Sequence, residues 1–126
     1  MNRFFLAAAI TVILLFSSCV TTVFVDEEMS PAEMIQRAHE AMDRNNYAVA
    51  IQYYEALGLR FSHDIDLVIT SKYHIAFINY KQKYYTQARV GMLDVISYYN
   101  APDAVFYPQH FKRLAQIVLE NIERQS

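Results

Sequence analysis

The sequence predicts an all-α fold for residues 30–126, a short α-solenoid of five helices arranged as antiparallel pairs. Apolar side chains recur along this stretch at spacings of three and four residues, which is the period of amphipathic helices. Polar turns separate the periodic runs, and the chain has only 2 Gly and 3 Pro, so few residues interrupt a helix. Two segments also match each other at an offset of 38 residues, and such an internal repeat is typical of solenoids.

The N-terminus has the pattern of a secretory signal. One basic residue, Arg3, precedes the uncharged apolar run 4–16, as in the charged and hydrophobic regions of such signals. The pattern predicts export. The apolar run could also continue to Val25 as an uncleaved membrane helix, since about 20 residues are enough to span a bilayer. Plain cleavage without an anchor is the third reading.

The residues around Cys19, the single cysteine, favour a lipid anchor. The four residues before it, LFSS, resemble the lipobox of bacterial lipoproteins, although Phe16 stands where Leu is usual. This resemblance implies a signal peptide over 1–18, lipidation such as palmitoylation on Cys19, and a tether over 19–29 that reaches about 35 Å at most. Because Val20 is not the Asp that retains lipoproteins in the inner membrane, the resemblance favours the periplasmic face of the outer membrane.

The first two predicted helices form a hairpin. The first begins at Pro31 and runs over 31–44, because Ser30 is a good N-cap, Pro suits the first helical position, and Glu33 completes a capping box. Two asparagines then end the helix. The second helix is predicted over 47–61, where apolar residues again recur every three or four positions.

Three further helices follow. Asp66 is predicted as the N-cap of a helix over 67–81. The next helix is predicted over 85–98 and is stopped by Pro102, which disfavours helical backbone before it. The fifth is predicted over 108–124, with one apolar face.

The internal repeat resembles the tetratricopeptide repeat, or TPR. Tyr47 aligns with Tyr85 at the offset of 38, and each precedes by three residues an alanine of the second helix. The resemblance implies two repeats, over about 31–65 and 69–103, and a half repeat over 108–124. It also implies that small side chains let the helices pack closely, at Ala38, Ala50, Ala76, Ala88 and Ala115.

The match departs from the family in four ways. The family's large aromatic of the first helix is Ala41 and Asn79 here, and an alanine of its second helix is Leu57 and Val95. The period is four or five residues longer than usual, and the family's closing Pro is absent. Repeats of this longer kind are similar to those of the TPR lipoprotein subunit of the outer-membrane β-barrel assembly machinery. Gly58 and Gly91 interrupt second helices at a cost of about 1 kcal/mol each, so we expect close helix contact at both.

The sequence predicts no enzyme, no cofactor and no metal site. Gly-rich phosphate loops and Gly-x-Ser-x-Gly motifs are absent from it, and a net charge of −2 gives no footprint for nucleic acid. The stretch His63-Asp64-Ile65-Asp66 groups possible metal ligands, but a capped turn uses the same residue types. His39 and His74 are interpreted as groove or surface histidines.

The aromatic residues carry the functional prediction. In TPR proteins the first helix of each pair lines a concave groove, and those positions select Ile35, His39, Met42, Tyr73, Phe77 and Tyr80. The sequence therefore predicts a membrane-anchored periplasmic scaffold or adaptor that binds a protein or peptide through this groove. Three alternatives stay open: these residues are core beneath the fifth helix, they pair with a second copy in a homo-oligomer, or they enclose an apolar small molecule for a transporter.

Overall fold

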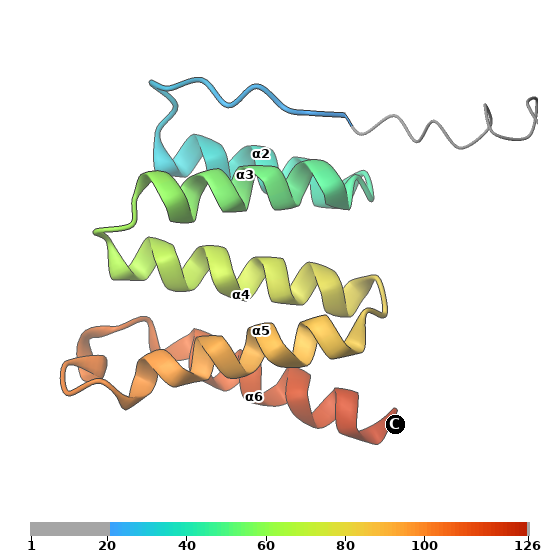
Figure 1. Ribbon diagram of the computed structural model, residues 1–126, viewed down its shortest axis with the longest axis vertical. Coiled ribbons are helices and arrows are strands. Elements are labelled where there is room, and N and C mark those ends of the chain that lie inside the picture. The colour runs from blue at the N-terminus through green and yellow to red at the C-terminus, as the bar shows by residue number, and fades with distance from the viewer. Residues whose placement is uncertain (1–20, 126) are drawn as a thin grey trace, which may run out of the picture.

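The computed structural model describes residues 21–125, and within this range all regular structure is helical, without strands (Figure 1). The five predicted helices are confirmed. The predicted signal peptide and Cys19 lie outside the described residues. Within 21–125, no helix combines the length and apolarity needed to cross a bilayer. The helices are α2 (Pro31–Asp43), α3 (Tyr47–Arg60), α4 (Ile65–Lys81), α5 (Tyr85–Ser97) and α6 (Gln109–Arg124), with short 3-10 helices η2 (Tyr98–Asn100) and η3 (Ala104–Phe106).

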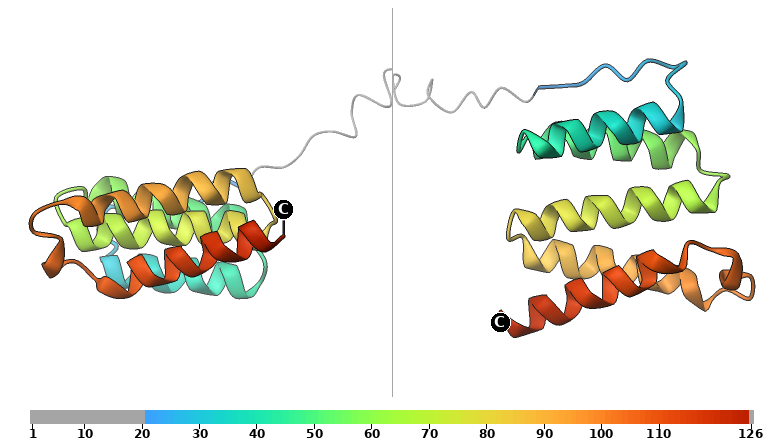
Figure 2. Two further views of the ribbon diagram at one scale, coloured as in Figure 1. Left: turned by 90° about the horizontal axis from the view of Figure 1, so that it is seen from below. Right: turned by 180° about the vertical axis from the view of Figure 1, so that it is seen from behind.

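The helices stack in chain order as in a short solenoid. α2 packs on α3 and α4 on α5 as antiparallel hairpins, while α3 contacts α4 and α5 contacts α6. α6 also contacts α4. Figure 2 shows α2 and α6 on one side of the stack and α3 and α5 on the other. α4 therefore shares one face with α2 and α6, and the opposite face with α3 and α5.

The predicted start of α2 is confirmed in atomic detail. The Ser30 hydroxyl accepts a hydrogen bond from the Glu33 amide at 3.3 Å, and the Ser30 amide donates to the Glu33 carboxylate at 2.9 Å. Pro31 occupies the first helical position. These bonds satisfy amides that the first turn of a helix leaves unpaired. They also lower the pKa of the Glu33 carboxyl, because they stabilise its charged form.

The two hairpin turns have the same backbone structure. Asn45 and Lys83, which are 38 residues apart, both adopt left-handed backbone, with φ of 57° and 65°. In each turn the next residue's amide donates to the carbonyl five residues earlier, at 2.8 Å in the first turn and 2.9 Å in the second. This is the Schellman motif, in which Gly is the usual left-handed residue. The repeat seen in the sequence is thus also a repeat of turn geometry.

The predicted start of α4 is wrong by two residues. Asp64, not Asp66, is the N-cap, and its carboxylate accepts from the amides of Asp66 and Leu67 at 3.0 and 3.2 Å. The helix therefore begins at Ile65. In α6, Pro108 caps the helix instead of opening it, and the two 3-10 turns between α5 and α6 were not predicted because such short turns have no periodicity to detect.

Small residues bring the helices together. The five predicted packing alanines, Ala38, Ala50, Ala76, Ala88 and Ala115, are all at most 1% exposed. A Cβ built on Gly91 would lie 2.6 Å from the Cβ of Ala76, and one built on Gly58 would lie 2.7 Å from the hydroxyl oxygen of Ser71. The expected close contact at both glycines is therefore confirmed, and it joins α3 to α4 and α4 to α5.

Part of the stretch expected to be a tether packs on the helices. The side-chain amide of Gln52 accepts from the Val23 amide and donates to the Thr21 carbonyl, both at 2.8 Å. The Arg60 guanidinium donates to the Asp26 carbonyl at 2.7 Å and to its two neighbouring carbonyls. Residues 21–29 thus run along α3 and do not reach out as a free extended chain.

Candidate protein-binding face

α2, α4 and α6 together build one face of the solenoid, called here the α2–α4–α6 face. Each of these helices brings one histidine to it: His39 from α2, His74 from α4 and His110 from α6. The rings of His39 and His74 have centroids 5.3 Å apart, and the charge of His110 acts on His74. The three histidines therefore mark where the three helices converge.

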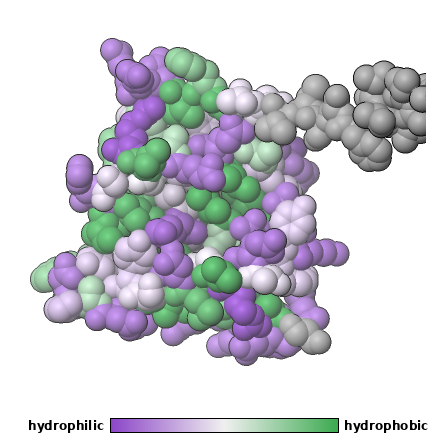
Figure 3. All heavy atoms as spheres, viewed as in Figure 1, coloured by the Kyte–Doolittle hydropathy of each residue, from purple (hydrophilic) through white to green (hydrophobic). Residues whose placement is uncertain are grey.

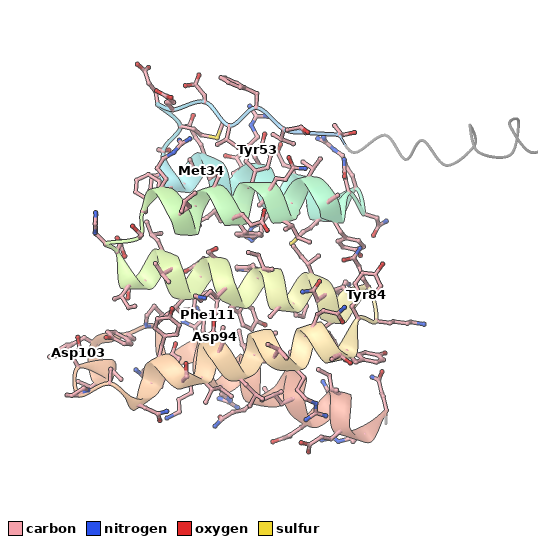
Figure 4. All side chains as sticks on the ribbon, viewed as in Figure 1. Met34, Tyr53, Tyr84, Asp94, Asp103 and Phe111 are labelled. Atoms are coloured by element: carbon pink, nitrogen blue, oxygen red, sulfur yellow. The ribbon has the colours of Figure 1, made fainter. Side chains whose placement is uncertain are left out.

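His74 lies at the centre of an aromatic cluster. Its ring stacks on that of Tyr54 with centroids 4.7 Å apart, and it meets Tyr73 and Phe111 edge-on at 5.3 and 5.9 Å. Figure 4 shows Phe111 near α4, between α4 and α5 in that view. The cluster joins α3, α4 and α6 through ring contacts.

Two polar atoms of this cluster are buried without a hydrogen-bond partner, Nδ1 of His74 and the hydroxyl oxygen of Tyr54. Burial lowers the pKa of His74 to about 4, and the charges of His39 and His110 lower it further in the same direction. Burial raises the pKa of Tyr54. Both side chains are therefore neutral at pH 7, and the centre of the face is uncharged.

A row of aromatic rings continues along α4. Tyr73, Phe77, Tyr80 and Tyr85 follow one another with ring centroids about 6 Å apart, at 5.9, 6.2 and 6.0 Å. Tyr73 is only 6% exposed and lies 4.9 Å from Phe111 of α6. The C-terminal helix thus covers Tyr73, whereas Phe77 and Tyr80 remain partly exposed.

Of the predicted groove residues of α2, His39 contacts the aromatic cluster, through the ring of His74. His39 is exposed, and Ile35 and Met42 are partly buried against the core formed by α2 and α3. The structure brings His39 and Tyr73 together through their shared contact with His74. Ring contacts through His74 thus connect four of the six predicted residues, His39, Tyr73, Phe77 and Tyr80.

Sequence reasoning missed the contribution of α6. Contacts of Phe111 fix the rotation of this helix, so that His110, Leu114 and Ile117 form one stripe at spacings of four and three residues. Leu114 and Ile117 are 39% and 42% exposed. The sequence pattern predicted Leu114 on the buried apolar face of the fifth helix together with Phe111 and Ala115, and its exposure corrects that prediction. Ile117 lies outside that face, so its position was a signal that could have been used.

The described residues show no arrangement for metal chemistry. Within 21–125, no group of three or more His, Cys, Asp or Glu side chains could hold a metal ion. In the stretch that groups His63 with two carboxylates, Asp64 caps α4, as the capped-turn reading expects. The absence of enzymatic activity stays a prediction.

Three cavities lie away from the α2–α4–α6 face. One of about 610 Å³ lies between the α3–α4 turn and the loop before α6, next to Phe61 and Phe106. Two others, of about 420 and 200 Å³, share Lys72 and Ile75 on the α3–α5 side. Figure 3 shows hydrophobic patches separated by polar side chains on that side.

Comparison with known proteins identifies one relative and no family. No family model matches the chain, and no solved structure matches it. An uncharacterized protein of Treponema pallidum (strain Nichols) is 28% identical over 99 residues, which are 79% of this chain and 40% of the relative. The chain thus covers less than half of the length of that relative.

Proposed function

We propose that this protein is a membrane-anchored scaffold that binds a protein partner through the α2–α4–α6 face. The observation that carries the proposal is the set of apolar side chains that α4 and α6 leave accessible: Leu114 and Ile117 on α6 are 39% and 42% exposed, and Phe77 and Tyr80 on α4 are partly exposed. α6 packs on both α4 and α5, and this packing holds these side chains in place. A partner would therefore meet a preformed surface, which lowers the entropy cost of binding.

The chemistry of this face suits a protein ligand. Aromatic side chains bury large areas while losing little rotamer freedom, and Tyr hydroxyls can bond to a partner's backbone. His74, buried at the centre, is neutral at pH 7. A partner that covers His74 therefore does not incur the free-energy cost of removing a charged imidazole from water.

The setting we propose is the periplasmic face of the outer membrane. Its support is the lipobox-like sequence before Cys19 and the similarity of the repeats to those of TPR lipoproteins in outer-membrane β-barrel assembly. An outer-membrane assembly or transport complex is the corresponding partner class. A pocket for an apolar small molecule is the weaker alternative, because the two cavities of about 610 and 420 Å³ lie at other places in the fold.

Site-specific photo-crosslinking in intact cells tests the proposal. A photoreactive phenylalanine analogue replaces Leu114 or Phe77 on the proposed face, and Val90 or Leu93 on α5 as controls. The controls match in character, because Val90 and Leu93 are apolar and 64% and 52% exposed. We expect one cross-linked protein shared by the two positions of the face and absent from both controls. The same product from all four positions, or none from the face, contradicts the proposal.

A further inference from the structure

The solenoid has two edges with different chain segments. The hairpin edge consists of the two left-handed turns, 43–47 and 81–85, and the end of α6 at 124–125. The loop edge consists of 26–30, 61–66 and 98–108. Figure 4 shows Tyr84 at the first edge and Asp103 at the second, on opposite sides of the molecule.

The two edges carry opposite charge. The segments of the hairpin edge contain four basic residues, Arg44, Lys81, Lys83 and Arg124, and a single acidic one, Asp43. The segments of the loop edge contain six acidic residues and neither Lys nor Arg: Asp26, Glu27, Glu28, Asp64, Asp66 and Asp103. Arg124 is ion-paired with Glu120, and Arg60 adjoins the acidic α3–α4 turn. The difference in charge between the two edges therefore comes mainly from Arg44, Lys81 and Lys83 at the hairpin edge and from the six carboxylates at the loop edge.

The position of segment 21–29 on α3 determines which edge of the domain lies nearest to Cys19. Its first residue, Thr21, is bonded to Gln52 in the first half of α3, and its later carbonyls are bonded to Arg60 at the end of α3. The segment thus runs from the hairpin edge toward the loop edge (Figure 1). Cys19 precedes Thr21 by two residues, so their Cα atoms are at most about 7 Å apart.

We propose that the hairpin edge contacts the anionic phospholipid surface of the membrane. This inference depends on the membrane anchoring proposed above. A lipid on Cys19 brings this edge within reach of the headgroups, and its basic residues then face anionic lipid. Each Lys or Arg near an anionic surface strengthens binding about fivefold. Tyr84, which is 52% exposed between Lys83 and α5, is an aromatic residue of the kind enriched at membrane interfaces.

This orientation has a consequence for the partner-binding face. When the hairpin edge contacts the membrane, the helix axes run away from the bilayer surface. The α2–α4–α6 face is then roughly perpendicular to that surface and does not contact it. The acidic loop edge, with Phe106 exposed to 83%, points away from anionic lipid. The docked orientation therefore leaves the proposed partner-binding face open.

Tryptophan fluorescence tests the orientation, because the chain contains no Trp. The full chain, purified with its anchor, carries either Tyr84→Trp or the matched control Phe106→Trp and is reconstituted into phosphatidylethanolamine–phosphatidylglycerol vesicles with brominated acyl chains. We expect bromine to quench Tyr84→Trp and to leave Phe106→Trp unchanged. We expect the double substitution Lys81→Glu and Lys83→Glu in the Tyr84→Trp chain to reduce the quenching. Salt at about 0.5 M should reduce it as well, because salt screens the attraction to anionic lipid.

The outcomes separate this inference from the proposed function. Palmitate labelling of the wild-type chain and of Cys19→Ala reports the lipid anchor independently of the fluorescence. A labelled, vesicle-bound chain in which Phe106→Trp is quenched as strongly as Tyr84→Trp, or in which neither is quenched, overturns the orientation and leaves the anchor intact. Cross-linking from Leu114 tests the partner-binding face, and Tyr84→Trp leaves that face unaltered.

Discussion

The ring of Tyr54 lies flat against the imidazole of His74, with centroids 4.7 Å apart and planes 3° apart. This contact links α3 to α4, and so joins the first helical hairpin to the second. Neither the Tyr54 hydroxyl nor Nδ1 of His74 has a hydrogen-bond partner in the buried cluster. The stack is therefore held by ring packing around a neutral imidazole, and charging that imidazole will weaken it.

Stability should fall as the pH is lowered from about 6.5 to about 4. Burial depresses the pKa of His74 in the folded chain to about 4, while the unfolded chain titrates near the ordinary value of 6.5. Between these values the unfolded state binds more protons, so acid favours unfolding. At about 1.4 kcal/mol per pKa unit, we expect a loss of about 2–3 kcal/mol across this window. Urea unfolding at pH 7.5, 6.0, 5.0 and 4.0 measures it.

The control for this experiment removes the titrating ring. His74→Phe keeps an aromatic ring in the stack, and its stability should depend less on pH between 7.5 and 5.0 than that of the wild type. His63→Gln changes an exposed histidine in the α3–α4 turn and should leave the wild-type slope unchanged. Equal slopes in wild type and His74→Phe would show that other groups cause the pH dependence.

Gly91→Ala should destabilise the protein even though Ala is the better helix former. Helix propensity alone predicts a gain of about 1 kcal/mol. The new Cβ, however, would lie 2.6 Å from the Cβ of Ala76, so α4 and α5 must move apart, and overpacking of this kind costs about 1–3 kcal/mol. The free energy of unfolding in urea decides which effect is larger.

A double variant identifies the cause of that loss. Ala76→Gly removes the methyl group that the new Cβ meets, so it should cost less stability in the Gly91→Ala background than in the wild type. Strictly additive effects of the two substitutions would show that the close contact between α4 and α5 is not the reason.

Local signals in the sequence were enough to predict most of the fold. Ser30, Pro31 and Glu33 define the start of α2 by their own chemistry, and the structure shows the bonds they were expected to make. The start of α4 was placed wrongly because Asp64 and Asp66 are equally good caps by residue type. Backbone geometry decides between them, since the extended ψ of 104° at Asp64 directs its carboxylate to the free amides.

The repeat pattern could not predict the cluster of histidine and aromatic rings at the centre of the candidate site. Aligning Ala38 with Ala76 pairs His39 with Phe77, so the histidines of α2, α4 and α6 do not occupy equivalent positions. They meet because three helices converge in space, and α4 is longer than α2. The stacking of Tyr54, a second-helix residue, on His74 likewise depends on how the two hairpins pack.

Lys83→Gly should stabilise the α4–α5 turn. Lys83 adopts φ of 65°, which costs a residue with a Cβ about 1–2 kcal/mol, and Gly avoids this cost while losing more entropy on folding. We expect a net gain of about 0.5–1 kcal/mol, measured by thermal or urea unfolding. Gln82→Gly is the control, because φ is −81° there and Gly brings only its entropy cost. Gains from both substitutions would contradict the role of the left-handed backbone.

Arg60→Met should release residues 21–29 from α3. The guanidinium donates to three successive carbonyls of this segment, whereas Met keeps an apolar chain of similar length without a donor. We expect faster hydrogen exchange in 21–29 and a loss of about 1 kcal/mol in the free energy of unfolding. Arg37→Met, which removes an exposed ion pair with Glu40 and an electrostatic attraction to the exposed Glu33, should change neither. If exchange in 21–29 is unaltered, apolar packing holds the segment. If it rises, the same substitution should also reduce bromine quenching of Tyr84→Trp, because a released segment no longer fixes the hairpin edge against the membrane.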